Sequence, residues 1–129
     1  MGKVRDFGAR YFLLNDDHSV REVEMMEWAL MFSREDRRRI AWTGNKHKFV
    51  STVFLGLDHR FLSNGPPLLF ETMAFVDGGE KWESGEPRYE SIDCVRYSSW
   101  DDAETGHKAM VRKHLIDQRT RTGVANGQD

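Results

Sequence analysis

Apolar and polar residues alternate near the start of the chain in the pattern of a β-strand. Residues 11–14 form the first such run, residues 15–19 are rich in Asn and Asp, and residues 20–23 alternate again. Asn and Asp side chains hydrogen-bond to their own backbone and therefore favour tight turns. This pattern predicts a β-hairpin over residues 11–23.

A helical period replaces the alternation after Glu24. Apolar residues recur three and four positions apart, which places them on one face of an α-helix. Neither Gly nor Pro interrupts the segment before Gly44. We expect a first helix from Met25 to about Arg34, with an inner stripe that includes Met25, Trp28, Ala29 and Phe32.

The central region contains the longest apolar, β-branched and aromatic segments, on either side of a turn-like stretch at residues 62–65. A further apolar run follows an acidic, Gly-rich stretch at residues 77–90, which we expect to be a loop. β-branched and aromatic residues suit the pleated, half-buried surface of a sheet. We predict strands at residues 40–43, 49–57, 68–76 and 91–97.

A second helix has the clearest start signal in the chain. Ser99 followed by Asp102 matches a capping pattern, and acidic residues in the first turn complement the positive end of the helix dipole. We expect this helix to run from Trp100 to about Asp117 and residues 118–129 to form a disordered tail. Its inner stripe is formed by Ala103, His107, Met110, Val111, His114 and Leu115.

The order of these elements, ββ-α-ββββ-α, predicts an α+β domain over residues 1–117. We expect an antiparallel sheet of about five to six strands, with both helices packed on one face. In this arrangement the core includes Trp28, Phe32, Leu55, Met73, Val111 and Leu115.

Composition narrows the class of protein. The 129 residues suit one domain, and 39% apolar with 31% charged content is typical of a soluble globular protein. The polar N-terminus lacks the features of a secretory signal, so we expect a cytoplasmic location. The single cysteine, Cys94, excludes an internal disulfide, and its apolar neighbours predict a buried, inert thiol.

Three phrases, VSTVFLGLDHRF, GPPLLFETMAF and YSSWDDAETGH, follow an EWALMF helix and a DRRRIAW segment. In this order they resemble a family of short uncharacterised proteins of tailed phages and prophages. The resemblance covers roughly residues 11–115. It implies a host-cell cytoplasm and an accessory role, such as handling host factors or nucleotides, and carries no activity to transfer.

Polar residues in the central hairpin are the first candidates for a site. If Leu55 paired with Met73, His59 and Glu71 would be diagonal neighbours on one face. A carboxylate beside an imidazole is the minimum for acid–base chemistry, and His107 on the second helix would point toward the same sheet. The alternative is a structural buried contact, because no nucleophile motif accompanies them.

A basic segment is the second candidate. Arg38 and Lys48 would hold phosphates and Trp42 would stack on a base, although strand alternation prevents every neighbouring arginine from lining one groove. A solvated helix end is the alternative. The candidate ligand-binding residues are Asp58, His59, Arg60, Glu71, Thr72, His107, Arg38, Trp42 and Lys48.

No cofactor or metal site is indicated, since His107 and His114 lie two turns apart on the helix and cannot chelate one ion. Three classes of function remain. The favoured one is a non-enzymatic binding protein for a phosphorylated small molecule, a nucleotide or a host protein. The others are a small enzyme using His59, Glu71 and His107, and a structural or assembly subunit; the oligomeric state is left open.

Overall fold

The computed structural model describes residues 9–58 and 65–116, which form an α+β fold with two antiparallel sheets. The smaller sheet has the order β2-β1-β5 and contains β1 (Arg10–Leu14), β2 (Val20–Val23) and β5 (Leu57–Asp58). The predicted N-terminal hairpin is confirmed, with Leu14 paired to Val20. The turn is closed by a hydrogen bond from Asn15 N to Ser19 O.

The larger sheet has the order β3-β4-β6-β7. The prediction of one sheet of five to six strands is therefore wrong. Gly56 has a φ of 68°, a backbone conformation that favours glycine, and it turns the chain after β4. The next residues, β5, pair with β1 instead of continuing β4. The strands of this sheet are β3 (Arg39–Gly44), β4 (Lys48–Phe54), β6 (Phe70–Lys81) and β7 (Pro87–Tyr97).

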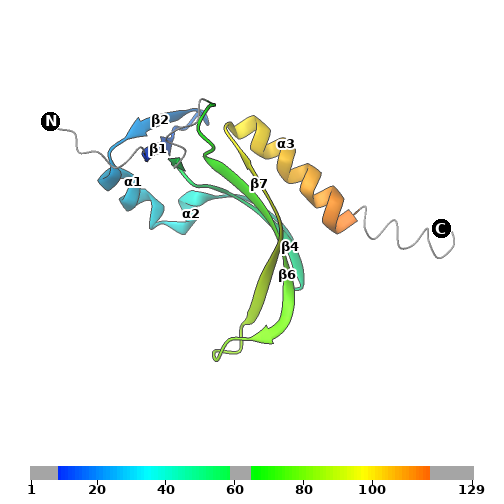
Figure 1. Ribbon diagram of the computed structural model, residues 1–129. Coiled ribbons are helices and arrows are strands. Elements are labelled where there is room, and N and C mark those ends of the chain that lie inside the picture. The colour runs from blue at the N-terminus through cyan, green and yellow to red at the C-terminus, as the bar shows by residue number, and fades with distance from the viewer. Residues whose placement is uncertain (1–8, 59–64, 117–129) are drawn as a thin grey trace.

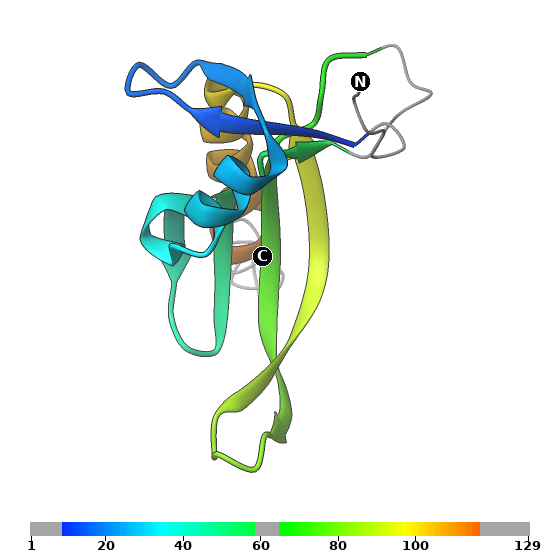
Figure 2. The same ribbon diagram turned by 90° about the vertical axis from the view of Figure 1, so that its left-hand side faces the viewer.

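The helices lie on opposite sides of the larger sheet, which corrects the expectation that both pack on one face. Figure 1 shows α3 (Trp100–Val111) on the convex side of the curved sheet, with α1 (Met25–Phe32) and α2 (Glu35–Arg38) on the concave side. Figure 2 shows the same arrangement from the concave side, with α3 behind the strands. The first helix ends earlier than expected, because Ser33 and Arg34 interrupt it before α2.

The second predicted helix begins as the capping pattern indicated. Ser99 Oγ accepts a hydrogen bond of 3.1 Å from the backbone N–H of Asp102. The α-helix ends at Val111 and continues as a π-helical segment, η1 (Arg112–Ile116). The predicted end at Asp117 and the predicted tail lie outside the described residues.

The acidic, Gly-rich stretch at residues 77–90 is mostly strand, so the loop prediction is wrong. β6 runs to Lys81, and β7 begins at Pro87. The ladder accommodates the glycines by a register shift between Asp77 and Lys81, and Gly79 has a φ of 91°. The result is a long hairpin that extends beyond the other strands (Figure 1).

The central strands β4 and β6 are antiparallel neighbours, as predicted, but the expected register is wrong. Ser51, not Leu55, lies opposite Met73.

The two faces of the larger sheet differ in what covers them. The covered face, against α3, carries the buried Val50, Thr52 and Phe54 of β4. The open face carries the alternate residues, including Ser51 and Val53.

The core lies between the covered face and α3 and continues under the smaller sheet. The buried apolar residues are Phe12, Leu13, Val50, Phe54, Leu69, Phe70, Ala74, Ala103 and Met110. The predicted core residues Trp28, Phe32, Leu55, Met73, Val111 and Leu115 are all only partly buried. Met73 lies on the open face, because the strand alternation was assigned one residue out of phase. Cys94, expected to be buried, is exposed on β7.

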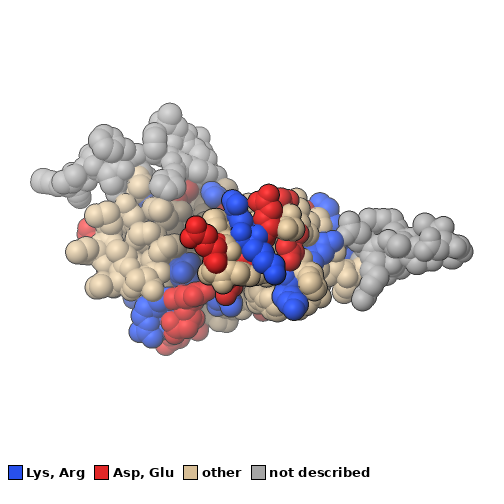
Figure 3. Space-filling view, turned by 90° about the horizontal axis from the view of Figure 1, so that it is seen from below, with Lys and Arg blue, Asp and Glu red and all other residues tan. Residues whose placement is uncertain are grey.

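An apolar patch on α1 remains at the surface. Met25, Met26 and Leu30 are 55%, 70% and 72% exposed. In Figure 3 the side of the molecule that carries α1, on the left, shows a broad area without Lys, Arg, Asp or Glu, while charged side chains crowd the middle of the view. Among the described residues, no helix is long and apolar enough to cross a membrane.

Candidate functional site: a polar network that ends at a cavity

α3 carries His107 onto the covered face of the larger sheet, where the side chain is only 6% exposed. Its Nδ1 lies 2.7 Å from Thr52 Oγ1 of β4, and its Nε2 lies 2.9 Å from Thr43 Oγ1 of β3. Both ring nitrogens therefore have a hydroxyl partner. A buried polar group needs such partners, because an unsatisfied one costs about 1–3 kcal/mol.

The network continues across the sheet. Thr52 Oγ1 lies 2.6 Å from Thr72 Oγ1, since the two threonines are directly paired between β4 and β6. Tyr97 on β7 lies near Thr72: burial raises the pKa of the tyrosine, and the side chain of Thr72 partly offsets this rise. Strand pairing thus lines up hydroxyl groups from neighbouring strands beneath one imidazole. The hydrogen-bonded order is Thr72, Thr52, His107 and Thr43.

The imidazole of His107 is held in its neutral form. Burial lowers the pKa of His107 below its ordinary value of 6.5, because the charged form loses hydration that no carboxylate replaces. A neutral imidazole has one N–H donor and one acceptor nitrogen, so one threonine donates to the ring and the other accepts from it.

A cavity of about 390 Å³ opens beside this end of the network. Thr43 and His107 form its polar part, and Val111 and Ile116 supply apolar wall. The remaining lining residues are Lys108 and Arg112, on successive turns of the same helical segment. The cavity therefore combines a hydroxyl, an imidazole, two cationic side chains and a small apolar surface.

In the described part of the chain, neither cationic side chain pairs with a carboxylate. Within residues 9–58 and 65–116, neither Lys108 nor Arg112 takes part in an ion pair. The next residue of η1, Lys113, does form one, with Asp93 at 2.9 Å. Lys and Arg donate charge-assisted hydrogen bonds to phosphate and carboxylate oxygens. Chemically, the cavity fits a small anion.

Asp93 fixes the segment that carries these residues. Its Oδ2 lies 2.8 Å from His114 Nε2 as well as 2.9 Å from Lys113 Nζ. These hydrogen bonds, His114 first, lower the pKa of Asp93 to about 2. The carboxylate therefore stays charged through the physiological range and ties η1 to β7.

The predicted acid–base group is not brought together. Glu71 lies on the open face, where it bonds to Arg96 at 3.0 Å and accepts a hydrogen bond from Cys94 Sγ at 3.5 Å. His107 lies on the covered face, so the sheet separates the two side chains. Thr72, which was predicted near Glu71, is instead connected to His107 through the hydroxyl of Thr52. His59, the third member of the group, lies outside the described residues, as does Arg60.

The other predicted ligand-binding residues are also dispersed. Asp58 is buried in β5 of the smaller sheet. Trp42 lies on the open face and stacks on Phe49, with ring centroids 5.4 Å apart. Lys48 shares the covered side of β4 with Val50, and Arg38 packs its guanidinium over Phe32, 4.5 Å from the ring centroid. The basic segment therefore forms no single groove.

Sequence reasoning missed Thr43, Lys108, Arg112 and Ile116. A signal for two of them was present: Lys108 follows His107 on the helix, and Arg112 stands four residues further. The contribution of Thr43 had no local signal, because it depends on the pairing of β3 with β4 and on the position at which α3 crosses them.

Among the described residues, no His, Cys, Asp and Glu side chains gather into a group that could hold a metal ion. Comparison with protein-family models, curated proteins and solved structures finds no match to this chain. We therefore infer the function from the geometry of the site.

Proposed function

We propose that this protein is a non-enzymatic binding protein for a small anionic ligand, such as a phosphorylated metabolite, and that the ligand occupies the cavity beside His107. The observation that supports this is the pair of unneutralised cations, Lys108 and Arg112, at a cavity whose polar part is Thr43 and His107. Val111 and Ile116 would contact an apolar portion of the ligand.

The charges at the cavity favour anion binding, although the cavity lies near the C-terminal end of α3. The C-terminal end of a helix carries partial negative charge and would oppose an anion by about 0.3–1 kcal/mol. Lys108 and Arg112 are both exposed, so each charge-assisted contact with a ligand contributes at most about 1 kcal/mol, and the two contacts together offset the dipole. Net affinity then depends on the additional contacts that the ligand makes with Thr43 and the apolar wall.

A binding role fits the polar network better than catalysis does. Both nitrogens of His107 bond to threonine hydroxyls at 2.7 and 2.9 Å, and no carboxylate orients the ring as a base. We also propose that the protein is an accessory protein of a phage or prophage. An accessory protein in a host cell would sequester or sense a phosphorylated host metabolite without transforming it.

The proposal is tested by thermal denaturation and calorimetry with inorganic phosphate, small phosphomonoesters, nucleoside monophosphates and small carboxylates. A ligand that binds only the native state stabilises it, by about 2.7 kcal/mol at a concentration one hundred times Kd. The double variant Lys108→Ala with Arg112→Ala should weaken binding by about tenfold, because two solvent-exposed charge-assisted contacts of about 0.5–1 kcal/mol each are lost.

Lys81→Ala is the matched control, because Lys81 is an exposed cation on the distant β6–β7 hairpin. It should leave the affinity unchanged. Absence of stabilisation by every anion at millimolar concentration, or an affinity that the double variant retains, would contradict the proposal.

A further inference from the structure

The open face of the larger sheet carries an aromatic cluster that none of the described helices covers. Phe49 is at its centre: its ring centroid lies 5.4 Å from Trp42, 5.0 Å from Phe75 and 5.0 Å from Tyr89. Trp42 is 43% and Tyr89 is 38% exposed. An antiparallel sheet face left to solvent is normally polar, so this cluster indicates an interaction surface.

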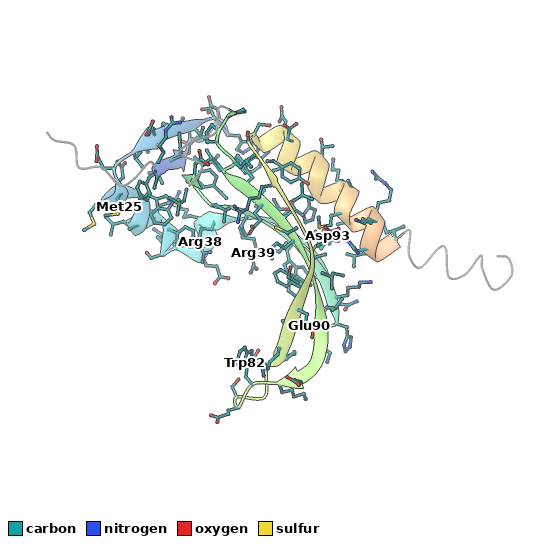
Figure 4. All side chains as sticks on the ribbon, in the orientation of Figure 1. Met25, Arg38, Arg39, Trp82, Glu90 and Asp93 are labelled. Atoms are coloured by element: carbon teal, nitrogen blue, oxygen red, sulfur yellow. The ribbon has the colours of Figure 1, made fainter. Side chains whose placement is uncertain are left out.

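Charge is distributed unevenly at the two ends of this concave face. At one end, residues 34–39 contain four arginines and two acidic residues, a net charge of +2, and are called the basic rim below. At the other end, residues 77–90 contain five acidic and two basic residues, a net charge of −3, and are called the acidic hairpin. Figure 4 shows Arg38 and Arg39 of the rim and Trp82 of the hairpin bordering the same concave side.

Some of these charges lack partners within the chain. In the part of the chain that the structure describes, Arg37 and Arg38 form no ion pair, and Nε of Arg38 is buried without a hydrogen-bond acceptor. Glu83 and Glu86, at the turn of the acidic hairpin, form no ion pair there either. The basic rim and the acidic hairpin of one molecule are at opposite ends of the face and cannot neutralise each other (Figure 1).

We propose that the concave face binds a second copy of this chain in a two-fold symmetric dimer. Two symmetric arrangements bring this face against itself. In one, hairpin meets hairpin and rim meets rim, which opposes like charges. In the other, the acidic hairpin of each copy lies against the basic rim of its partner, and the aromatic clusters meet in the middle. Electrostatic complementarity selects the second arrangement.

The composition of the face agrees with such an interface. Trp, Tyr and Arg are the residues that most often dominate binding energy at protein interfaces, and Trp42, Trp82, Tyr89 and Arg39 are all exposed on this side or at its border. The hairpin extends beyond the remainder of the sheet, so it reaches a partner that the rest of the sheet cannot (Figure 1).

Charge reversal distinguishes this dimer from other arrangements. The rim variant is Arg37→Glu with Arg39→Glu, and the hairpin variant is Glu83→Lys with Glu86→Lys. Each variant alone places like charges at both rim–hairpin contacts, so its dimer should be about a hundredfold weaker or more. A mixture of the two variants restores opposite charges at both contacts, so the heterodimer should form with nearly the wild-type affinity.

The measurement is analytical ultracentrifugation of the wild type, each variant and the mixture, over about 1–100 µM and at increasing salt, which should weaken the wild-type dimer. Glu104→Lys, at an exposed position of α3 on the other side of the sheet, is the control and should dimerise normally. Circular dichroism melting confirms that each variant is folded.

Several outcomes would overturn the proposal. A wild-type chain that sediments as a monomer throughout the concentration range is one, and a mixture in which both variants stay monomeric is another. If the monomer instead binds single-stranded oligonucleotides with quenching of Trp42 fluorescence, the concave face is a nucleic-acid-binding surface and not a dimer interface. The cavity beside His107 lies on the opposite side of the sheet, so these results do not depend on the proposed small-molecule function.

Discussion

The threonines beneath His107 show how single residues set the properties of this fold. Thr52 and Thr72 are both completely buried, at positions where a valine would fit the sheet equally well. Their hydroxyls satisfy one imidazole nitrogen and each other, so a polar side chain can be accommodated between α3 and the sheet. A fully satisfied network of this kind fixes where the helix lies, because displacement would leave its members unpaired.

The neutral state of His107 leads to a prediction about pH. Above its ordinary pKa of 6.5 the ring is neutral in both folded and unfolded chains and has no effect on pH dependence. Below 6.5 the unfolded chain binds a proton that the folded chain resists, since burial lowers the folded pKa. Stability should therefore fall as pH decreases from about 7 toward about 5, because this range begins near the ordinary pKa of 6.5, at which the unfolded chain starts to bind the proton.

Chemical denaturation across this pH range measures the effect. The wild type should lose stability more steeply than His107→Gln, which has no group to titrate at this position. Asp93 will not produce the same slope, because its pKa of about 2 lies below its ordinary value of 3.8 and its contribution is lost only between those values. Equal slopes for wild type and variant would show that His107 accepts a proton without cost.

At the scale of elements, the contact between α3 and β7 depends on the absence of a side chain. Gly106 is buried in the middle of α3, where glycine is usually unfavourable by about 1 kcal/mol relative to alanine. A Cβ at this position would overlap Oη and Cζ of Tyr97. The glycine therefore allows the tyrosine ring to pass beneath the helix.

We predict that Gly106→Ala destabilises the protein although alanine is the better helix former. Overpacking costs about 1–3 kcal/mol, and the overlap with ring atoms of Tyr97 makes this cost exceed the gain in propensity. Denaturant unfolding measures the difference. The double variant Gly106→Ala with Tyr97→Leu should be less destabilised than the sum of the single variants, because the smaller side chain removes the overlap. Strictly additive effects would refute the proposed steric conflict.

The elements also differ in how far their sequences predict them. The cap at Ser99 was predictable because a capping pattern involves residues three positions apart, and the hydrogen bond to Asp102 N is formed. The β1–β2 hairpin had an equally local turn signal. The division into two sheets was not predictable in this way, since it depends on Gly56 adopting a positive φ and on a long-range pairing between β5 and β1.

At the scale of the whole molecule, the sequence supported the α+β class but not the core or the candidate site. In β4 and β6 both faces carry apolar residues, so alternation alone could not show which one α3 covers. The same ambiguity affected the site. Glu71 and His107 were expected to be neighbours, but the true faces place them on opposite sides of the sheet.

The two faces differ in a measurable way. Phe54 is 0% exposed, so Phe54→Ala should destabilise the protein by about 3–5 kcal/mol. Its neighbour Leu55 is only partly buried, so Leu55→Ala should cost clearly less. Urea or guanidinium unfolding of both variants provides the comparison. A larger loss for Leu55→Ala would mean that the covered and open faces have been exchanged.

The turn at Gly56, where the chain passes from the larger sheet to the smaller one, also affects the order of folding. In the larger sheet every hydrogen-bonded neighbour follows its partner along the chain, apart from the short excursion to β5, so these strands can pair with little loss of loop entropy. The smaller sheet is completed only when Leu57 meets Tyr11, far back in the sequence. Non-local pairing of this kind is slow, so we expect the N-terminal hairpin to join an already assembled sheet and to be the first part to detach on unfolding.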